Sequence, residues 1–425
     1  MSNLRIVVPL RVHELTEDDA MQNPTDHLFT LALGLHSPWE CTETTFDQER
    51  SHLDLIIDFK RSSRFPCPVC EAPSCRVHDT VTKRWRHLDF FQHTCTIRAR
   101  VPRIACEECG VRQVPVPWAR EGSGFTLLFE ALVLSMAPHM PVRAIARQLR
   151  TTDQRLWRIL RHYVEDARAN EAYDDVTAIA VDETSSRRGH KYVTVVADIE
   201  TKRVIYATPG KDAATLGRFT TDFHAHNGDS DAIRQICMDM SPAYIAAATE
   251  CFPNAEHTYD HFHVMKLANE ALDEVRRADV RDNPYLKGSR YLWLRHPDKL
   301  TEKQRVKIAD LQQLNRKTAR GYQLVLTLRQ FWQMPIERGE EYLRDFCSWA
   351  MRSRLEPFKK LVRTIRAHWT GIMNYHKTKM TTGFMEGINS LIQAAKRKAR
   401  GYANVDNLIT MIYLIAGRLK FDLPI

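Results

Sequence analysis

Hydrophobic and polar residues alternate with a period of two early in the chain, and a helical spacing follows. Residues 53–59 alternate in this way, which predicts a strand. Residues 27–34 form a short apolar patch whose spacing selects neither a helix nor a strand, and the polar residues before it predict no element. Residues 125–136 and 142–149 predict two helices that are separated by prolines. The segment from Thr151 to Gln154 matches a capping box and predicts the start of a third helix.

A second change of spacing follows residue 175, where strands and helices begin to alternate. The predicted elements are strands at 176–181, 192–198, 204–208, 233–238 and 256–259, and helices at 213–224 and 243–250. Three antiparallel strands followed by alternating helices and strands predict a mixed α/β sheet. Residues 264–373 have mainly helical patterns, with a second capping box from Thr301 to Gln304. Two final helices are expected at 382–399 and 405–418.

Composition adds a basic character to this picture. The 425 residues are 44% hydrophobic and carry a net charge of +9, which suggests two to four domains with sizeable cores. Residues 60–120 hold 12 basic and 5 acidic side chains, and residues 276–329 hold 14 and 5. Such segments favour a polyanionic partner such as nucleic acid, although a solvated charged surface is the alternative. No apolar run is long enough to span a membrane, and no secretory signal is visible.

Two Cys-x-x-Cys pairs indicate a metal site. The four cysteines are Cys67, Cys70, Cys106 and Cys109. Two such pairs complete a tetrahedral zinc site with no open position, so one zinc ion would be structural. Residues 85–103 between the pairs are expected to form the hairpin of a zinc ribbon. Cys75 and His78 are alternative ligands at this stage.

The helices after residue 125 fit a helix-turn-helix. The third of them, which starts near Thr151, buries one apolar stripe. Its predicted outward side chains are Gln154, Arg155, Arg158 and Arg161. A second helix with exposed arginines suits the major groove of DNA, and Arg155 and Arg158 are the best candidates for reading bases. An ordinary three-helix packing unit is the alternative.

Three carboxylates stand where they could bind hard cations. Asp182 and Asp239 each follow an apolar strand, and Glu386 lies in the first turn of a predicted helix. Strands of an α/β sheet offer ligands at their carboxyl ends, and carboxylate oxygens suit Mg²⁺. Two such ions can clamp the attacking and leaving oxygens of a phosphate displacement. For a single strand-end aspartate such as Asp239, a turn or helix cap is the simpler alternative.

Polar residues around these acids form a supporting group. Glu183 follows Asp182, and a cluster of Asp260, His261 and His263 follows the strand at 256–259. The histidines could bind a transition metal, but a supporting role at the edge of the site is preferred. The helix of Glu386 presents an amide and a basic strip that suits phosphates. With Glu386, the strip holds Asn389, Gln393, Lys396 and Arg397, and Lys398 and Arg400 continue the basic cluster after it.

These motifs together resemble the DDE transposases of bacterial insertion sequences, in particular the ISL3 family. The matching stretches are Cys67-Pro-Val-Cys70, Arg103-Ile-Ala-Cys-Glu-Glu-Cys-Gly110, Val181-Asp-Glu-Thr-Ser185, Asp239-Met-Ser-Pro-Ala-Tyr244, Asp260-His-Phe-His-Val264, and Met385-Glu-Gly-Ile-Asn389 through Lys396-Arg-Lys-Ala-Arg-Gly-Tyr402. The resemblance covers about residues 28–418.

The resemblance implies a multidomain α+β fold with an RNase H-like mixed α/β catalytic core interrupted by a helical insertion. The implied segments are an N-terminal extension (1–27), a zinc-binding domain (28–120), a helix-turn-helix domain (121–172), the first part of the core (173–264), the insertion (265–375) and the C-terminal helices of the core (376–425). It also implies that Asp182, Asp239 and Glu386 are the catalytic triad and hold two Mg²⁺ ions, with Mn²⁺ as a substitute.

The expected activity is cleavage of the ends of a mobile element and transfer of the freed 3′-OH to target DNA. The expected partners are double-stranded DNA, as terminal inverted repeats and target, and a second copy of the chain, with no membrane. The expected location is the cytoplasm, at the nucleoid. Two alternatives are a DNA-binding regulator with an inactive RNase H-like scaffold and a non-mobile DNA nuclease.

Overall fold

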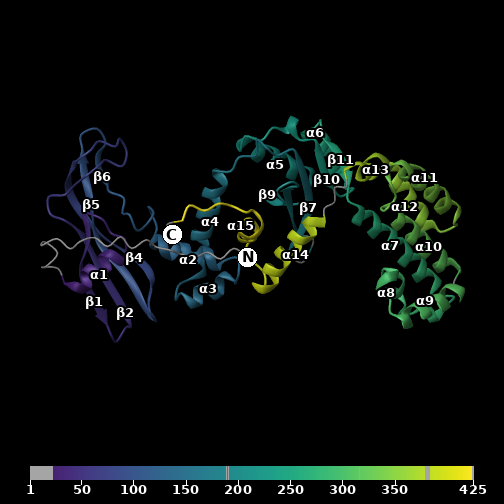
Figure 1. Cartoon of the computed structure of the whole chain (residues 1–425), viewed down its shortest axis with the longest axis horizontal. Coiled ribbons are helices and arrows are strands. Elements are labelled where there is room, and N and C mark those ends of the chain that lie inside the picture. The colour runs from purple at the N-terminus through teal and green to yellow at the C-terminus, as the bar shows by residue number, and fades with distance from the viewer. Residues whose placement is uncertain (1–22, 188, 190, 315, 379–382, 424–425) are drawn as a thin grey trace. The chain divides into compact units, whose positions relative to one another are not determined.

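The computed structural model describes residues 23–187, 189, 191–314, 316–378 and 383–423 (Figure 1). The chain divides into two compact units. One unit is Met1–Tyr163 with Lys420–Ile425, and the other is Val164–Leu419. Within the described residues, no helix is both long and apolar enough to cross a bilayer.

The first unit is built on a six-stranded sheet. Its strands are β1 (Trp39–Asp47), β2 (His52–Phe59), β3 (Arg64–Phe65), β4 (Cys75–Phe90), β5 (His93–Cys106) and β6 (Gly110–Gln113). They follow the order β1-β2-β5-β4-β3, with β6 on β5. One side of the sheet is apolar: Ile57, Ile97 and Val101 are fully buried in a shared core. The predicted strand at 53–59 is therefore β2, and the expected hairpin is the longer pair β4–β5.

Helices accompany this sheet, and the last of them, α4, continues into the second unit. The apolar patch at 27–34 belongs to helix α1 (Pro24–Ala32), and α2 (Leu127–Met136), α3 (Val142–Gln148) and α4 (Asp153–Ala169) follow the sheet. Helix α2 starts two residues later than its apolar pattern, because the Thr126 hydroxyl accepts a hydrogen bond from Phe129 N and caps it. Phe125 instead bridges to Arg86 of β4.

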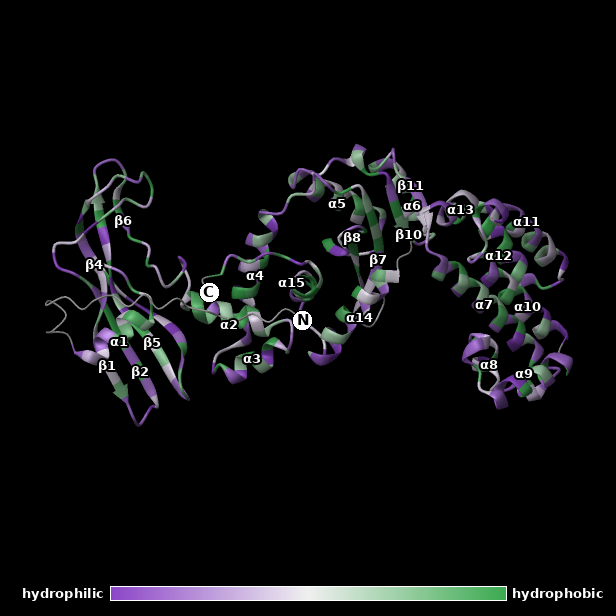
Figure 2. Ribbon diagram, viewed as in Figure 1, coloured by the Kyte–Doolittle hydropathy of each residue, from purple (hydrophilic) through white to green (hydrophobic). Residues whose placement is uncertain are grey.

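The second unit contains a five-stranded sheet in the order β11-β10-β7-β8-β9. Its strands are β7 (Ala178–Arg187), β8 (Lys191–Asp198), β9 (Arg203–Pro209), β10 (Gln235–Met238) and β11 (Glu256–Tyr259). The first three are antiparallel, β10 runs parallel to β7, and β11 runs parallel to β10. The predicted mixed α/β sheet is therefore present, and Figure 2 shows hydrophobic residues along β7 and β10.

One predicted strand end is wrong. β7 continues beyond Val181 to Arg187, because it pairs with β8 as far as the contact between Arg187 and Lys191. The apolar run stops at Val181, but the strand does not, since an antiparallel partner satisfies its backbone whatever the side chains are. Asp182 consequently lies inside β7 and not at its carboxyl end.

Helices α5 (Ala213–Ala225), α6 (Pro242–Cys251), α14 (Gly383–Lys398) and α15 (Val405–Ala416) accompany this sheet. Helix α15 is fixed to β9 by Ala207 N, which donates a hydrogen bond to the Tyr413 hydroxyl at 2.9 Å. The remaining described helices lie between β11 and α14 in sequence. They are α7 (His261–Asp279), α8 (Arg290–Leu294), α9 (Glu302–Leu314), α10 (Arg316–Phe331), α11 (Ile336–Arg352), α12 (Glu356–Ala367) and α13 (Trp369–Thr378).

These helices share one apolar core with the sheet. Leu272 of α7, Val325 of α10 and Val362 of α12 are buried in the same cluster as Ile179 and Ile236 of the strands. The predicted capping box at the start of α9 is confirmed by Gln304 N, which donates to the Thr301 hydroxyl, and by Thr301 N, which donates to Gln304 Oε1. Thr382, the first residue of the helix predicted at 382–399, lies outside the described residues.

Candidate DNA-binding and metal sites

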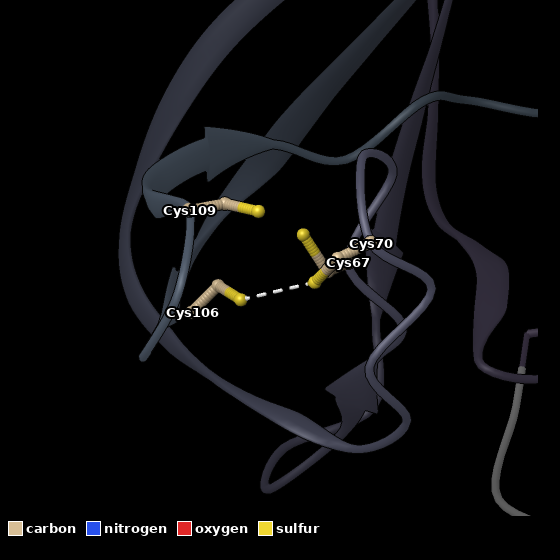
Figure 3. A group of neighbouring side chains, drawn as sticks. All are labelled: Cys67, Cys70, Cys106 and Cys109. Atoms are coloured by element: carbon tan, nitrogen blue, oxygen red, sulfur yellow. Dashed lines mark hydrogen bonds between the residues drawn. The ribbon is translucent and has the colours of Figure 1, made fainter.

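The four predicted zinc ligands gather at one point of the first unit. The sulfur atoms of Cys67, Cys70, Cys106 and Cys109 all lie within 4.8 Å of one another, and Figure 3 shows the four thiols converging. The first pair sits in the loop between β3 and β4, where Cys67 N donates to Ala72 O. The second pair spans the β5–β6 turn, in which Cys106 pairs with Gly110.

The electrostatics of this cluster favour a cation. Hydrogen bonds from the backbone of Cys70 and Val69 lower the pKa of the Cys67 thiol to about 6. The Cys109 thiol donates to Cys70, which raises the pKa of Cys109 to about 12. Crowding thus keeps some of these thiols protonated, and a bound Zn²⁺ would displace those protons and hold all four sulfur atoms as thiolates. The donor set therefore fits a structural zinc ion.

Cys75 and His78 do not belong to this group of ligands. Cys75 Sγ donates to Ala72 O at 3.5 Å, and His78 Nδ1 lies 3.4 Å from the Asp79 carboxylate. The alternative that either residue replaces one of the four cysteines has no support in this arrangement.

The predicted recognition helix α4 presents its polar residues as expected. Gln154, Arg155 and Arg158 are exposed, while Leu156 and Leu160 are fully buried. Arg161 is only partly exposed, and its Nε donates to Trp157 O at 3.3 Å. A buried stripe and an exposed guanidinium stripe on one helix suit binding to a DNA groove.

In the second unit, strand register brings three aspartates to one level of the sheet. Cys237 of β10 pairs with Ala180 of β7, so a step of two residues along each strand places Asp239 beside Asp182. Met238 pairs with Tyr259 of β11, so Asp260 follows beside Asp239. Asp260 N donates to Met238 O at 3.1 Å, which continues this pairing.

Asp182 is held by two donors. Its Oδ1 accepts from Glu183 N at 2.7 Å, and its Oδ2 accepts from Asn389 Nδ2 of α14 at 2.8 Å. Burial raises the pKa of the Asp182 carboxyl, and the negative charges of Asp260 and Asp239 raise it further. Three carboxylates are therefore crowded at this end of the sheet, and His263 beside Asp260 offsets only part of their charge.

Asp239 also takes part in a local turn. Its Oδ1 accepts from Ser241 N at 2.9 Å, immediately before α6, whose first residue is Pro242. The turn predicted as the simpler alternative is therefore formed, and it fixes the carboxylate at the end of β10. One side chain fills both roles, because a carboxylate oxygen that caps a turn leaves lone pairs for another partner.

Asp260 organises the histidines beside this site. It caps α7 by accepting a hydrogen bond from Phe262 N, and the Nδ1 atoms of His261 and His263 each lie 3.5 Å from its carboxylate. Its hydrogen bond and charge raise the pKa of His263 against the effect of burial, and the charge of Asp239 adds to the shift. The histidines thus lie against Asp260, and within the described part of the chain they form no separate metal-ligand group.

Comparison with known proteins decides the family. Residues 179–412 match the DDE transposase model of the ISL3 family, described as "Transposase". Residues 114–164 match the helix-turn-helix domain of transposase family ISL3, and residues 63–109 match the zinc-finger of transposases IS204, IS1001, IS1096 and IS1165. The transposase for insertion sequence element IS1557 of Mycobacterium tuberculosis is 30% identical over 80% of this chain and 83% of that protein.

The chain belongs to the ISL3 family of DDE transposases. The transposase for insertion sequence element IS1001 of Bordetella parapertussis is similar too, with 26% identity over 79% of this chain and 85% of that protein. A simian T-cell lymphotropic virus intasome in complex with PP2A regulatory subunit B56 gamma aligns over 41% of this chain and 70% of that chain. Its identity is 16% and its TM-score 0.17, which is too low to support an argument about the fold.

Glu386, the third predicted acid of this ISL3 transposase, does not lie in the group formed by Asp182 and Asp239. Glu386 is exposed on α14, one helical turn before Asn389. Within the described ranges, only the four cysteines come close enough together to share an ion. The structure thus aligns Asp182 with Asp239, but it does not bring the Glu386 carboxylate into a common ligand group with them.

The polar strip of α14 contacts β7 directly. Gln393 Nε2 donates to the Thr184 hydroxyl at 2.8 Å, and Lys396 Nζ donates to Ser185 O at 2.6 Å. Burial lowers the pKa of Lys396. The ammonium predicted to contact phosphate therefore holds the helix on the strand, whereas Arg397, Lys398 and Arg400 are exposed.

Tyr244 and Thr194, which sequence reasoning did not single out, lie beside the predicted Glu183. Glu183 is hydrogen-bonded to Tyr244 of α6, and burial raises the pKa of its carboxyl. The Tyr244 hydroxyl also bonds to the Thr194 hydroxyl at 2.8 Å. Tyr244 belongs to the matched motif that begins at Asp239, but its bond to Glu183 depends on cross-strand geometry that spacing does not show.

Proposed function

We propose that this ISL3 transposase binds the terminal inverted repeats of an insertion sequence, cleaves the element ends by phosphodiester hydrolysis, and joins the 3′-OH to target DNA. In this proposal Asp182, Asp239 and Glu386 are the catalytic triad. The main support is the alignment of Asp182 with Asp239 across β7 and β10. Helix α14 lies beside them, because its Asn389 donates a hydrogen bond to Asp182.

The residues present fit a magnesium site. Carboxylate oxygens are the ligands that Mg²⁺ prefers, and the acids that raise the pKa of Asp182 mark a place where a cation would relieve repulsion. Asn389 Oδ1 is buried and has no hydrogen-bond partner among the described residues. We propose that Asp182, Asp239 and Glu386 hold two Mg²⁺ ions, or Mn²⁺ in their place. When bound, the ions would activate water and stabilise charge on the attacking and leaving oxygens.

The neighbouring side chains position the reacting groups. Asn389 orients the Asp182 carboxylate through its hydrogen bond. Asp260 favours a protonated His263, which can donate to a phosphate oxygen near the acids. Glu183 and His261 support the site from its edge. Arg397 and Lys398 at the exposed end of α14, with Arg400 just after it, would bind the DNA backbone together with Lys396.

We also propose the larger organisation that the family likeness implies. Strands β7 to β11 with α14 and α15 would form an RNase H-like core in segments 173–264 and 376–425, with the helices of 265–375 inserted between them. Segments 28–120 and 121–172 would recognise the inverted repeats through Gln154, Arg155, Arg158 and Arg161. Two element ends must be processed together, which favours a homodimer on DNA at the nucleoid in the cytoplasm.

The test is a Mg²⁺-dependent nicking assay on a duplex that carries the element end. Wild type is expected to nick it only with Mg²⁺ or Mn²⁺, and to give strand-transfer products with a target duplex. Asp182→Asn and Glu386→Gln should each reduce nicking by at least about a hundredfold while retaining DNA binding. Arg344→Gln, at an exposed ion pair on α11, serves as a control that should cut normally.

Each failure has a distinct meaning. Binding without nicks in wild type would favour the regulator with an inactive scaffold. Nicks without strand transfer would favour a non-mobile nuclease. Full activity of Glu386→Gln would remove that residue from the triad. The metal ligands would then be sought among Asp182, Asp239 and Asp260, which the sheet aligns.

A further inference from the structure

Four of the eight arginines on the strands of the first unit are neutralised by aspartates. The ion pairs are Arg86 with Asp89, Arg98 with Asp54, Arg100 with Asp58 and Arg103 with Asp79. A paired guanidinium contributes little net charge to the surface, so the basic composition of residues 60–120 overstates what a polyanion would meet. The arginines without such partners matter more.

Arg84 of β4 is one of these exceptions. It is exposed and lies directly opposite Arg98 in the β4–β5 register. Its positive charge and that of Arg158 act on Arg155 of the recognition helix, whose pKa is lowered chiefly by burial. Among the described residues, no carboxylate forms an ion pair with Arg84, Arg155 or Arg158. Arg84 and Arg158 thus both lie close enough to Arg155 to repel its charge, and none of the three has an acidic partner among the described residues.

A strand-like bridge joins β4 to residues 124–126, the segment just before α2. Arg86 N donates to Gly124 O at 2.9 Å and Thr126 N donates to Arg86 O at 3.0 Å, which lays Phe125 along β4. The guanidinium of Arg155 lies 4.2 Å from the centre of the Phe125 ring. The recognition helix thus rests on a segment that is itself hydrogen-bonded to β4, two residues from Arg84.

A second contact ties the helix-turn-helix to the tip of the same hairpin. Arg150, in the turn between α3 and α4, has a positive φ of 52°. Its guanidinium donates to Gln92 O at 3.0 Å and pairs with Asp89. The sheet and the helix-turn-helix are therefore joined at two places, through Phe125 and through Arg150.

We propose that Arg84 of the zinc-bearing sheet binds the DNA backbone together with Arg155 and Arg158, so that sheet and helix-turn-helix form one composite DNA-binding surface. Like charges held together without acids are stabilised by a polyanion, and DNA phosphates supply that charge. The occupant is duplex DNA, because the surface continues the helix expected in the major groove. The inference rests on the DNA binding proposed for α4, but it does not require cleavage.

The test measures DNA binding by the full chain with zinc present and Mg²⁺ absent. Two duplexes of equal length are used, one with the element end and one scrambled, across a range of salt concentrations. Arg84→Gln should weaken binding to both duplexes alike and reduce the slope of log K against log salt by about 0.9, the value for one phosphate contact. Arg84→Lys keeps the charge and should keep the wild-type slope.

Arg100→Gln is the matched control, since it removes the same charge from the same sheet at a residue paired with Asp58, and it should leave the slope unchanged. Equal slopes for wild type and Arg84→Gln, or equal losses in Arg84→Gln and Arg100→Gln, would overturn the composite surface. Should Arg84→Gln not fold, a wild-type slope in Arg84→Ala with normal zinc content would also overturn it. If wild type itself binds neither duplex, the proposed function fails as well.

Discussion

At the scale of single residues, Asn389 connects the two halves of the candidate catalytic site. Its Nδ2 donates to Asp182 on β7, while Glu386 lies one turn earlier on the same helix. A hydrogen bond to an ionised carboxylate contributes about 1.5–3 kcal/mol, more than one between neutral groups. Asn389 is therefore expected to set the orientation of Asp182 and the position of α14 at once.

We expect Asn389→Ala to slow end cleavage by roughly 10- to 100-fold, because about 1.4 kcal/mol corresponds to a factor of ten. The measurement is single-turnover nicking at saturating Mg²⁺ and DNA. Ser390→Ala, the next and exposed position on α14, should cut at the wild-type rate. Unchanged cleavage in Asn389→Ala would show that the bond to Asp182 is dispensable.

At the scale of elements, close packing holds β11 in place. Gly371 of α13 lies against the ring of Tyr259, and a Cβ at residue 371 would stand 2.3 Å from Tyr259 Cε2. The helix and strand approach this closely because the glycine has no side chain. β11 leads directly into Asp260. The position of the acidic row, which is Asp182, Asp239 and Asp260, therefore depends on this contact.

Gly371→Ala should therefore destabilise the second unit by about 1–3 kcal/mol, the typical cost of overpacking. Gly217→Ala in α5 is the control, since nothing lies within 4 Å of its added Cβ, and it should stabilise by up to about 1 kcal/mol. Denaturant unfolding of the full chain measures both. A Gly371→Ala midpoint equal to or above that of wild type would contradict this packing argument.

The elements also show what sequence patterns can and cannot predict. The strand at 256–259 is β11 with the same bounds, and the start of α9 follows from its capping box, because both depend on local chemistry. The extent of β7 depends on pairing with β8, so its polar end was missed. The contact of Lys396 with Ser185 joins residues 211 positions apart, and no local pattern encodes it.

The acidic residues of the candidate site likewise include some that the sequence predicted correctly and one whose setting it could not predict. Spacing singled out Asp182 and Asp239 as neighbours of apolar strands, and the register of β7, β10 and β11 aligns them with Asp260. The setting of Glu386 could not be predicted, because it depends on how α14 packs against β7. Propensity describes one segment at a time, whereas a site is made where separate segments meet.

At the scale of the whole molecule, two compact units carry different chemistry. The thiolate group lies in Met1–Tyr163, while the aligned aspartates lie in Val164–Leu419. Soft sulfur ligands select zinc, and carboxylates select magnesium. The two metals should therefore affect two separable steps, DNA binding and DNA cleavage.

Removal of each metal tests this division. Cys70→Ser should lose the single zinc ion and binding to the element end, because structural zinc contributes about 10–16 kcal/mol to small zinc domains. Cys75→Ser is the matched control and should keep both, since Cys75 lies outside the ligand group. Omission of Mg²⁺ from wild type should leave binding intact and stop cleavage.

Three measurements check these outcomes. Native mass spectrometry measures the zinc content, fluorescence anisotropy measures DNA binding, and the nicking assay measures cleavage. Loss of zinc in Cys75→Ser would add a fifth cysteine to the site, and zinc-free chains that still bind the end would separate the zinc ribbon from DNA recognition.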